Sequence, residues 1–269
     1  MPRDPLRIVN QGGRERLIQP RTGLDITDSM DEFTDRFIAS MPPVDGFLFK
    51  YGSPTIGLYN IKVYDHPVGP GIAGRTSGLF ARKLLHDYPG YPLEDDMRMR
   101  NRKISDEFFT KIFALAGFRE AAETGDPDAV KDFHKRNRYL FMCYNSDAGA
   151  ALDNALARRD NEEYFREMKR LLANPRIAGG YINVSKRIFE RYSDRLSSKE
   201  TAWFQDLVEK YRKNKVSRDG LLEALELVAV RISDWETVDQ TLFAPYPQEL
   251  VPDADEERDR NYWKEVNAT

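Results

Sequence analysis

The hydrophobic pattern of the chain changes near residue 125, and this change constrains the fold more than any other feature of the sequence. Before it, short apolar runs of strand length alternate with helical stretches, and after it almost every apolar stretch has helical spacing. Asp126 suits a helix N-cap and Pro127 suits the first helical position. We therefore expect an α/β segment over residues 1–124, an all-α helical domain over residues 125–250, and an acidic, solvated tail over residues 251–269.

The α/β segment contains two strand candidates, residues 46–49 and residues 61–64. We expect one helix to begin after Ser29 as its N-cap. A second helix, capped by Thr76 or Ser77, follows a Gly/Pro-rich loop. Strands that alternate with helices favour a parallel sheet. Because two strands are few for a sheet, we expect an incomplete, Rossmann-like parallel sheet.

Helical spacing also predicts the elements that follow. A helix is expected to open at Ser105, just before the boundary. Beyond it, further helices are expected over residues 150–172, 178–192, 198–213 and 219–231.

Composition excludes several classes of protein. The formal net charge is −3, so the whole chain gives no argument for nucleic-acid binding, and such a claim needs a local patch. The single cysteine, Cys143, cannot form an internal disulfide. No apolar run has the length of a signal peptide or approaches the roughly 20 residues of a spanning helix. We therefore expect a cytoplasmic protein with no membrane partner.

The sequence offers no recognisable metal or nucleophile motif. His66, His86 and His134 are far apart, without the close spacings of zinc sites. The acidic residues 94–96 lack the alternating ligands of a calcium loop, and a solvated turn is expected there. Cys143 lies among apolar neighbours, which make a thiol inert and favour a core position. We expect no metal site in this chain.

The turn over residues 50–57 is the strongest candidate for a catalytic site. It follows an apolar strand, and ligands of open α/β sheets bind beyond the carboxyl ends of strands. Lys50, Ser53 and Thr55 supply an amine and two hydroxyls there, and an ordinary turn is the alternative. The Gly-rich loop before Thr76 has amides suited to a phosphate but no P-loop sequence, and an ordinary surface loop is the alternative.

A local basic surplus is the candidate RNA-binding surface. Residues 131–218 contain 20 Lys and Arg against 12 Asp and Glu, a surplus of 20 − 12 = 8. Clustered bases interleaved with aromatic residues suit a phosphate backbone with stacked bases. The alternative is a solvated helical face with intrahelical ion pairs. The candidate RNA-binding residues are His134, Lys135, Arg136, Arg138, Tyr139, Lys186 and Arg187.

Two families resemble successive parts of this chain. Residues 2–120 resemble the thiouracil-desulfurase-like family, domain of unknown function 523. The stretches that carry this resemblance are Thr22-Gly23-Leu24-Asp25-Ile26-Thr27, Asp45-Gly46-Phe47-Leu48-Phe49-Lys50, Ser53-Pro54, Lys62-Val63-Tyr64-Asp65 and Gly78-Leu79-Phe80-Ala81-Arg82. Residues 130–250 resemble the YbgA-type helical domain, domain of unknown function 1722. The stretches there are Phe133-His134, Arg138-Tyr139-Leu140-Phe141-Met142, Asn183-Val184, Leu196-Ser197, Tyr211-Arg212 and Pro245-Tyr246-Pro247-Gln248-Glu249-Leu250.

The resemblance implies a desulfidase that removes sulfur from thiolated pyrimidines, including 4-thiouridine in tRNA, with the helical domain as the RNA holder. The family's chemistry uses a [4Fe–4S] cluster on three cysteines. Two of these cysteines lie before the region that this chain matches, and Ile56 stands at the position of the third. In the helical domain Arg138 stands where the family usually has Lys, while Tyr144 and Arg187 stand where it usually has His.

These departures favour a degenerate desulfidase-family protein with no cofactor of its own, which retains binding to RNA, such as tRNA, or to a partner. One alternative is an active thiopyrimidine desulfidase. Its ligands would come from a longer N-terminus or a partner chain, or its chemistry would differ and use Lys50, Ser53 and Thr55. A protein-binding module is the third hypothesis. The open edge of an incomplete sheet also predicts a homodimer or a partner chain.

Overall fold

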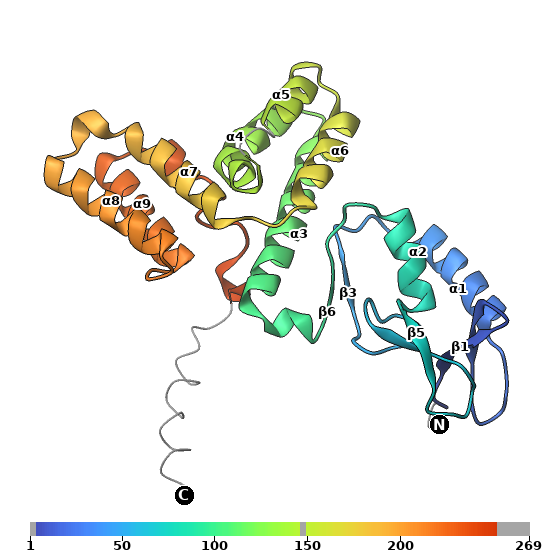
Figure 1. Cartoon of the computed structure of the whole chain (residues 1–269). Helices are drawn as coiled ribbons and strands as arrows, with labels where there is room; N and C mark the ends of the chain where they lie inside the picture. The colour runs from blue at the N-terminus through green and yellow to red at the C-terminus, as the bar shows by residue number, and fades with distance from the viewer. Residues whose placement is uncertain (1–3, 146–148, 252–269) are drawn as a thin grey trace, which may run out of the picture.

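The computed structural model describes residues 4–145 and 149–251 (Figure 1). Strands and two helices form the N-terminal part, and helices form the remainder. The expected fold class, an α/β segment followed by an all-α domain, is confirmed. The expected acidic tail lies outside the described residues, apart from Val251. No helix in the described part of the chain has both the length and the apolar composition that crossing a bilayer requires.

A four-stranded sheet consists of two antiparallel hairpins joined by one parallel pair. Its strands are β1 (Arg7–Gln11), β2 (Arg14–Ile18), β4 (Ile61–Tyr64) and β5 (Ile72–Thr76), in the order β2-β1-β4-β5. The pairs β1–β2 and β4–β5 are antiparallel, and β1–β4 is parallel. Gly12 and Gly13 have φ of 61° and 86°, as a two-residue turn between paired strands requires.

A second, two-stranded sheet lies closer to the helical part (Figure 1). It pairs β3 (Phe47–Phe49) with β6 (Leu93–Asp95) in parallel. The two predicted strands are therefore β3 and β4, but they belong to different sheets. The expected incomplete parallel sheet is present only as two parallel pairs among the described residues, β1–β4 and β3–β6. The turns after β1 and β4 return the chain as antiparallel hairpins.

The first helix, α1 (Thr27–Ser40), begins earlier than predicted. Ser29 lies inside it, so the predicted cap is wrong. The Thr27 hydroxyl accepts a hydrogen bond of 2.7 Å from the backbone N–H of Leu17 in β2. This bond ties the first turn of α1 to the sheet, which explains the earlier start.

The second helix, α2 (Leu79–Asp87), also begins without the predicted cap. Thr76 ends β5, and the Ser77 hydroxyl donates to the backbone carbonyl of Leu58 at 2.6 Å. Gly78 is the N-cap residue, and no side chain caps the helix. The predicted loop before Thr76 is largely the strand β5.

The helical part begins with the long helix α3 (Arg102–Glu123), which Figure 1 shows between the strands and the other helices. Asn101 caps it, so the predicted start at Ser105 is one turn late. The predicted helix over residues 150–172 is two helices, because the chain turns at Arg159 with φ of 54°. The further elements are η1 (Arg98–Arg100), α4 (Pro127–Tyr144), α5 (Gly149–Ala157), α6 (Asn161–Leu172), α7 (Ala178–Glu190), η2 (Ser193–Arg195), α8 (Ser198–Arg212), α9 (Arg218–Ile232), α10 (Trp235–Val238) and η3 (Gln248–Leu250).

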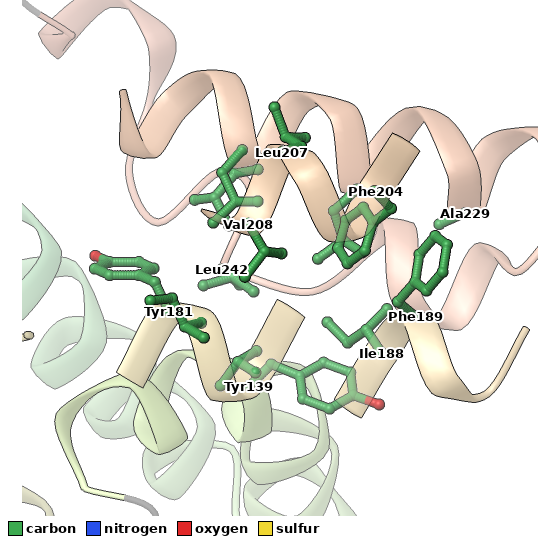
Figure 2. Close-up of a cluster of buried hydrophobic side chains, with 14 of the residues drawn as sticks. Tyr139, Tyr181, Ile188, Phe189, Phe204, Leu207, Val208, Ala229 and Leu242 are labelled. Atoms are coloured by element: carbon green, nitrogen blue, oxygen red, sulfur yellow. The ribbon is translucent and has the colours of Figure 1, made fainter. Parts of the chain in front are cut away.

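Two hydrophobic clusters hold these helices together, and α4 contributes to both. One joins α4 to α3, α5 and α6, and includes the fully buried Leu115 and Tyr164. The other joins α4 to α7, α8 and α9, as Figure 2 shows. Within it, the rings of Phe189 and Phe204 stack with centroids 3.9 Å apart. As predicted, Asp126 is the N-cap of α4 and Pro127 follows at the first helical position.

Helices α4 and α7 approach so closely that one position in α7 accepts only glycine. A Cβ on Gly180 would lie 2.3 Å from the carbonyl oxygen of Cys143. Its neighbour Gly179 has far more room, since a Cβ there would find its nearest atom, in Ile177, at 3.9 Å. The contact between α4 and α7 therefore depends on Gly180 and not on Gly179.

Substitution of these two glycines by alanine should have opposite effects. We expect Gly180→Ala to lower the free energy of unfolding by on the order of 1–3 kcal/mol, because the backbones must separate. We expect Gly179→Ala to raise it by roughly 0.5–1 kcal/mol, since alanine favours the helix. Urea unfolding of both variants measures the difference. Equal effects would contradict the close approach of α4 and α7.

Candidate functional site

The turn over residues 50–57 lies where the sequence predicts it, beyond the carboxyl ends of β3 and β6. Lys50 directly follows β3, and Asp96 directly follows β6. The Lys50 ammonium pairs with the Asp96 carboxylate, which also accepts the backbone N–H of Tyr51 at 2.9 Å. The hydrogen bond with Lys50, followed by that with Tyr51, lowers the pKa of Asp96. Lys50 is thus a charged partner of Asp96.

The hydroxyls of Ser53 and Thr55 stabilise the turn itself. They lie 2.9 Å apart, and Ser53 Oγ accepts the backbone N–H groups of Thr55 and Ile56 at 3.3 and 3.2 Å. Within the described residues, no Lys, His, Asp or Glu side chain hydrogen-bonds to either hydroxyl. A nucleophilic hydroxyl needs an adjacent base. The structure therefore does not bring Lys50 together with the two hydroxyls.

The amino end of α2 is covered by this turn. The carbonyl of Thr55 accepts the backbone N–H of Phe80 at 3.0 Å, and the carbonyl of Gly57 accepts that of Gly78 at 2.8 Å. A Cβ on Gly78 would lie 2.3 Å from the Thr55 carbonyl oxygen, so the backbones are in contact. The free amides that a phosphate needs at a helix terminus are already used. The expected phosphate site before α2 is not supported by this geometry.

Ile56 turns its side chain toward an apolar cluster. The cluster contains the buried residues Phe49, Leu58, Ala81 and Leu84, and Ile56 packs against it. An aliphatic side chain in such surroundings contributes to packing and offers no lone pair. The turn at this position therefore joins α2 to β3 by hydrophobic contact.

Aromatic and basic side chains line a pocket beside the turn. They include Tyr51, Tyr59, Arg75 and Arg98, with the Arg98 guanidinium 5.5 Å from the centre of the Tyr59 ring. None of the three predicted catalytic residues is among the pocket's lining side chains. The predicted and the observed features of this region are therefore adjacent but separate.

The acidic residues 94–96, in and directly after β6, form part of the fold instead of a solvated turn, which corrects that expectation. Glu94 and Asp95 are buried within β6. Glu94 accepts a hydrogen bond from Arg98 Nε at 2.6 Å, and Asp95 accepts the backbone N–H groups of Met97 and Arg98. Strand pairing with β3 draws these carboxylates inward, and nearby donors compensate their burial.

Cys143 is a core residue, as its neighbours predict. It is fully buried in the contact between α4 and α7, and this burial raises the pKa of its thiol to about 12. In residues 4–145 and 149–251, no group of three or more His, Cys, Asp or Glu side chains is placed to hold a metal ion.

Two of the predicted RNA-binding residues point inward. The Tyr139 ring is 2% exposed, and its hydroxyl accepts a hydrogen bond from Arg191 at 2.8 Å. His134 lies between Tyr164, whose hydroxyl is 2.9 Å from Nδ1, and Asp153, whose carboxylate is 3.1 Å from Nε2. Burial lowers the pKa of His134, although Asp153 opposes this shift. A base cannot stack on the buried Tyr139 ring, so that expected role is corrected.

The other five predicted residues are exposed on α4 and α7, two helices that pack against each other. We call this set the α4–α7 basic surface, and it consists of Lys135, Arg136, Arg138, Lys186 and Arg187. Lys135 lies 3.6 Å from Glu236, and the Arg138 guanidinium lies 4.6 Å from the centre of the Tyr139 ring. Within the described residues, Arg136, Lys186 and Arg187 have no carboxylate partner, and neither has the Arg138 guanidinium.

Some of the remaining bases of the surplus are paired along their own helices. On α6, Arg166 and Arg170 pair with Glu167, and on α8, Lys210 pairs with Asp206 and Arg212 with Glu209. Intrahelical ion pairs therefore account for part of the surplus, whereas most of the α4–α7 basic surface has no carboxylate partner among the described residues.

A buried ionic cluster, which was not predicted from the sequence, joins the two ends of the helical part. Asp106 on α3 accepts hydrogen bonds from Arg176 at 2.7 Å, from Arg218 and from the Tyr246 hydroxyl at 2.9 Å. Arg176 also donates to Glu107 at 2.8 Å. The one signal in the sequence is that Asp106 lies inside the apolar run around residue 108. An acid buried there needs charged or hydrogen-bonding partners.

The partners of Asp106 keep it ionised. Burial by itself raises the pKa of Asp106, but the hydrogen bond from Arg218 and the charges of Arg176 and Arg218 outweigh it and lower the pKa. A carboxyl whose pKa is lower in the folded chain contributes stability above its unfolded value of about 3.9. That contribution is lost as the pH falls through the lowered pKa.

Removal of this carboxylate should be far more damaging than removal of a surface one. We expect Asp106→Ala to lower the free energy of unfolding by about 3–5 kcal/mol, because two guanidinium groups lose their buried partner. The control Asp206→Ala removes an exposed i,i+4 partner of Lys210. It should change the free energy of unfolding by less than about 0.5 kcal/mol. Denaturant unfolding at neutral pH measures both. A similar, small effect of the two substitutions would show that the cluster is not structural.

Comparison with known families follows the same division of the chain. Residues 1–96 match the family described as 2-thiouracil desulfurase, and residues 138–247 match the family described as protein of unknown function (DUF1722). No curated protein and no solved structure matches the chain. The two matches carry the predicted resemblance and leave the whole of α3 between them. Residues 1–96 are thus similar to the 2-thiouracil desulfurase family, and residues 138–247 are similar to the DUF1722 family.

Proposed function

We propose that this chain is a non-catalytic relative of the 2-thiouracil desulfurases that binds RNA, with tRNA as the first candidate, through the α4–α7 basic surface. The observation that carries the proposal is the set of exposed bases without carboxylate partners on two helices that pack together. Unpaired surface cations release counterions when they meet phosphates, which supplies most of the affinity for a nucleic-acid backbone.

The side chains at the turn support the absence of catalysis. The resemblance implies a [4Fe–4S] cluster, and such clusters require thiolates. Ile56, at the position of a family cysteine, packs into an apolar cluster, and Cys143 is buried between α4 and α7. The residues present therefore do not fit the cluster, and we derive no reaction step through it.

Electrostatics also explains how a chain with a net charge of −3 would bind RNA. Screening limits the reach of charges to about 8 Å at physiological salt, so a phosphate responds to nearby side chains and not to the distant acids. On α4 and α7 the nearby exposed side chains include Arg136, Lys186 and Arg187. Binding through them is expected to weaken steeply with salt.

Two double variants test the proposal: one neutralises arginines without a carboxylate partner, and the other neutralises arginines that have one. Arg136→Gln with Arg187→Gln removes two unpaired charges of the α4–α7 basic surface. The matched control, Arg170→Gln with Arg212→Gln, removes two charges that are ion-paired on α6 and α8. We expect the first pair to reduce the slope of log affinity against log salt by about 1.4–1.8, and the control to leave it nearly unchanged.

Fluorescence anisotropy with labelled tRNA at several salt concentrations measures this slope. Equal effects of the two double variants would place the RNA elsewhere. The absence of binding by the unsubstituted chain at low salt would favour a protein-binding module instead.

The cluster itself can be tested on the same protein. Anaerobic reconstitution with iron and sulfide should leave no stoichiometric iron and no iron–sulfur absorption spectrum, because the chain has a single thiol and it is buried. A bound [4Fe–4S] spectrum, or release of sulfur from a thiopyrimidine by the purified chain, would restore the enzyme hypothesis.

A further inference from the structure

A cavity of about 220 Å³ lies beside the buried ionic cluster, far along the sequence from the turn. The first turns of α3, α7 and α9 and the chain around residue 245 line it. In liquid water this volume corresponds to about seven molecules, which is enough for a small metabolite and too little for a nucleotide. The cavity belongs to the DUF1722 part, and the RNA-binding proposal does not use it.

One end of the cavity offers hydrogen-bond donors. Tyr181 is 5% exposed and lines the cavity, and its hydroxyl has no hydrogen-bond partner among the described residues. Figure 2 shows this hydroxyl pointing away from the hydrophobic side chains around the Tyr181 ring. The guanidinium groups of Arg176 and Arg218 each lie 5.9 Å from the centre of that ring. A buried, unpaired hydroxyl next to two cations suits a carboxylate.

The lining also includes carboxylates on α9, of which Glu223 is exposed. Asp219, Glu223 and Glu226 line the cavity from one face of α9, since their spacing is i, i+4 and i+7. Asp219 pairs with Arg102 and Arg218, but within the described residues Glu223 and Glu226 form no ion pair. Burial, followed by the charge of Glu223, raises the pKa of Glu226. An ammonium group between these two carboxylates would relieve their repulsion.

The structural role of the ionic cluster does not explain why the Tyr181 hydroxyl, Glu223 and Glu226 line the cavity. Asp106 is saturated by Arg176, Arg218 and Tyr246, whereas the Tyr181 hydroxyl and the two glutamates take no part in that network. The cavity lining therefore combines a hydroxyl donor beside guanidinium groups with carboxylates that have no cationic partner among the described residues. A ligand that carries both a carboxylate and an ammonium group can use both kinds of group.

We propose that this cavity binds a small molecule that carries a carboxylate and an ammonium group, such as a free amino acid. Its carboxylate accepts the Tyr181 hydroxyl on the side of the guanidinium groups. Its ammonium group lies at Glu223 and Glu226. This assignment is independent of RNA binding, because the residues of the α4–α7 basic surface do not line the cavity.

The test uses the full chain and the free amino acids as probes, with acetate and methylamine as probes that carry a single charge. We expect at least one amino acid to raise the melting temperature and to bind in calorimetry, at concentrations where acetate and methylamine have no effect. Tyr181→Phe removes only the hydroxyl and should weaken that binding by on the order of ten-fold or more. Because this hydroxyl has no partner in the described protein, the variant should fold as stably as the unsubstituted chain.

Matched controls separate binding from general damage. Glu226→Gln should also weaken binding, whereas Glu190→Gln on the exposed face of α7 should not. Tyr211→Phe removes a phenolic hydroxyl that does not line the cavity and should leave binding unchanged. Three results would overturn the proposal: no amino acid binds, acetate or methylamine alone binds as well, or Tyr181→Phe binds like the unsubstituted chain.

Discussion

The arrangement of the helices depends on one buried carboxylate. Asp106 on α3 binds Arg176 before α7, Arg218 at the start of α9 and Tyr246 near the end of the described chain, so a single side chain ties together four distant segments. Isolated burial of these charges would be prohibitive, and mutual pairing with hydrogen bonds makes it tolerable. Because α3 also contributes Leu115 and Phe118 to the cluster with α4 and α6, the ionic cluster and the hydrophobic core fix the same helix. The positions of α7 and α9 relative to α4, and hence the exposed face of α4 and α7, follow from this.

The fold class could be predicted because hydrophobic spacing is a local signal, whereas strand pairing is not. The helices beyond Pro127 were found from their periodicity, and the break at Arg159 was missed because a residue with positive φ leaves no trace in the spacing. Strands β1, β2 and β5 were missed for a different reason. β1 and β2 each have only two adjacent apolar residues, beside charged or polar ones, and so lack the alternation that indicates a strand. β5 is exposed and contains glycine, so it has the composition of a loop. Only pairing with β4 makes β5 a strand.

The position of the candidate turn at the end of a strand could be predicted from the sequence, but the hydrogen bonds of its side chains could not. The turn after β3 lies at the carboxyl end of the strand, yet Ser53 and Thr55 bond within the turn and Lys50 pairs with Asp96. Hydroxyls in turns commonly satisfy backbone N–H groups, and sequence spacing cannot distinguish this use from catalysis. On α4, Tyr139 and Cys143 are four positions apart and so face the core together. The Tyr139 ring, which was predicted to stack on a base, is therefore buried. Arg136 and Arg138, at other positions around the same helix, are exposed.

The central claim is that RNA meets the α4–α7 basic surface and not the turn after β3, and lysine footprinting tests it most directly. The chain is treated with an amine-reactive reagent with and without tRNA, and the modification of each lysine is measured by mass spectrometry. We expect tRNA to protect Lys135 and Lys186, while Lys50, paired with Asp96, and Lys210, paired with Asp206, keep their reactivity. Protection of Lys50 with unchanged reactivity of Lys186 would contradict the account and would place the RNA at the desulfurase-family segment.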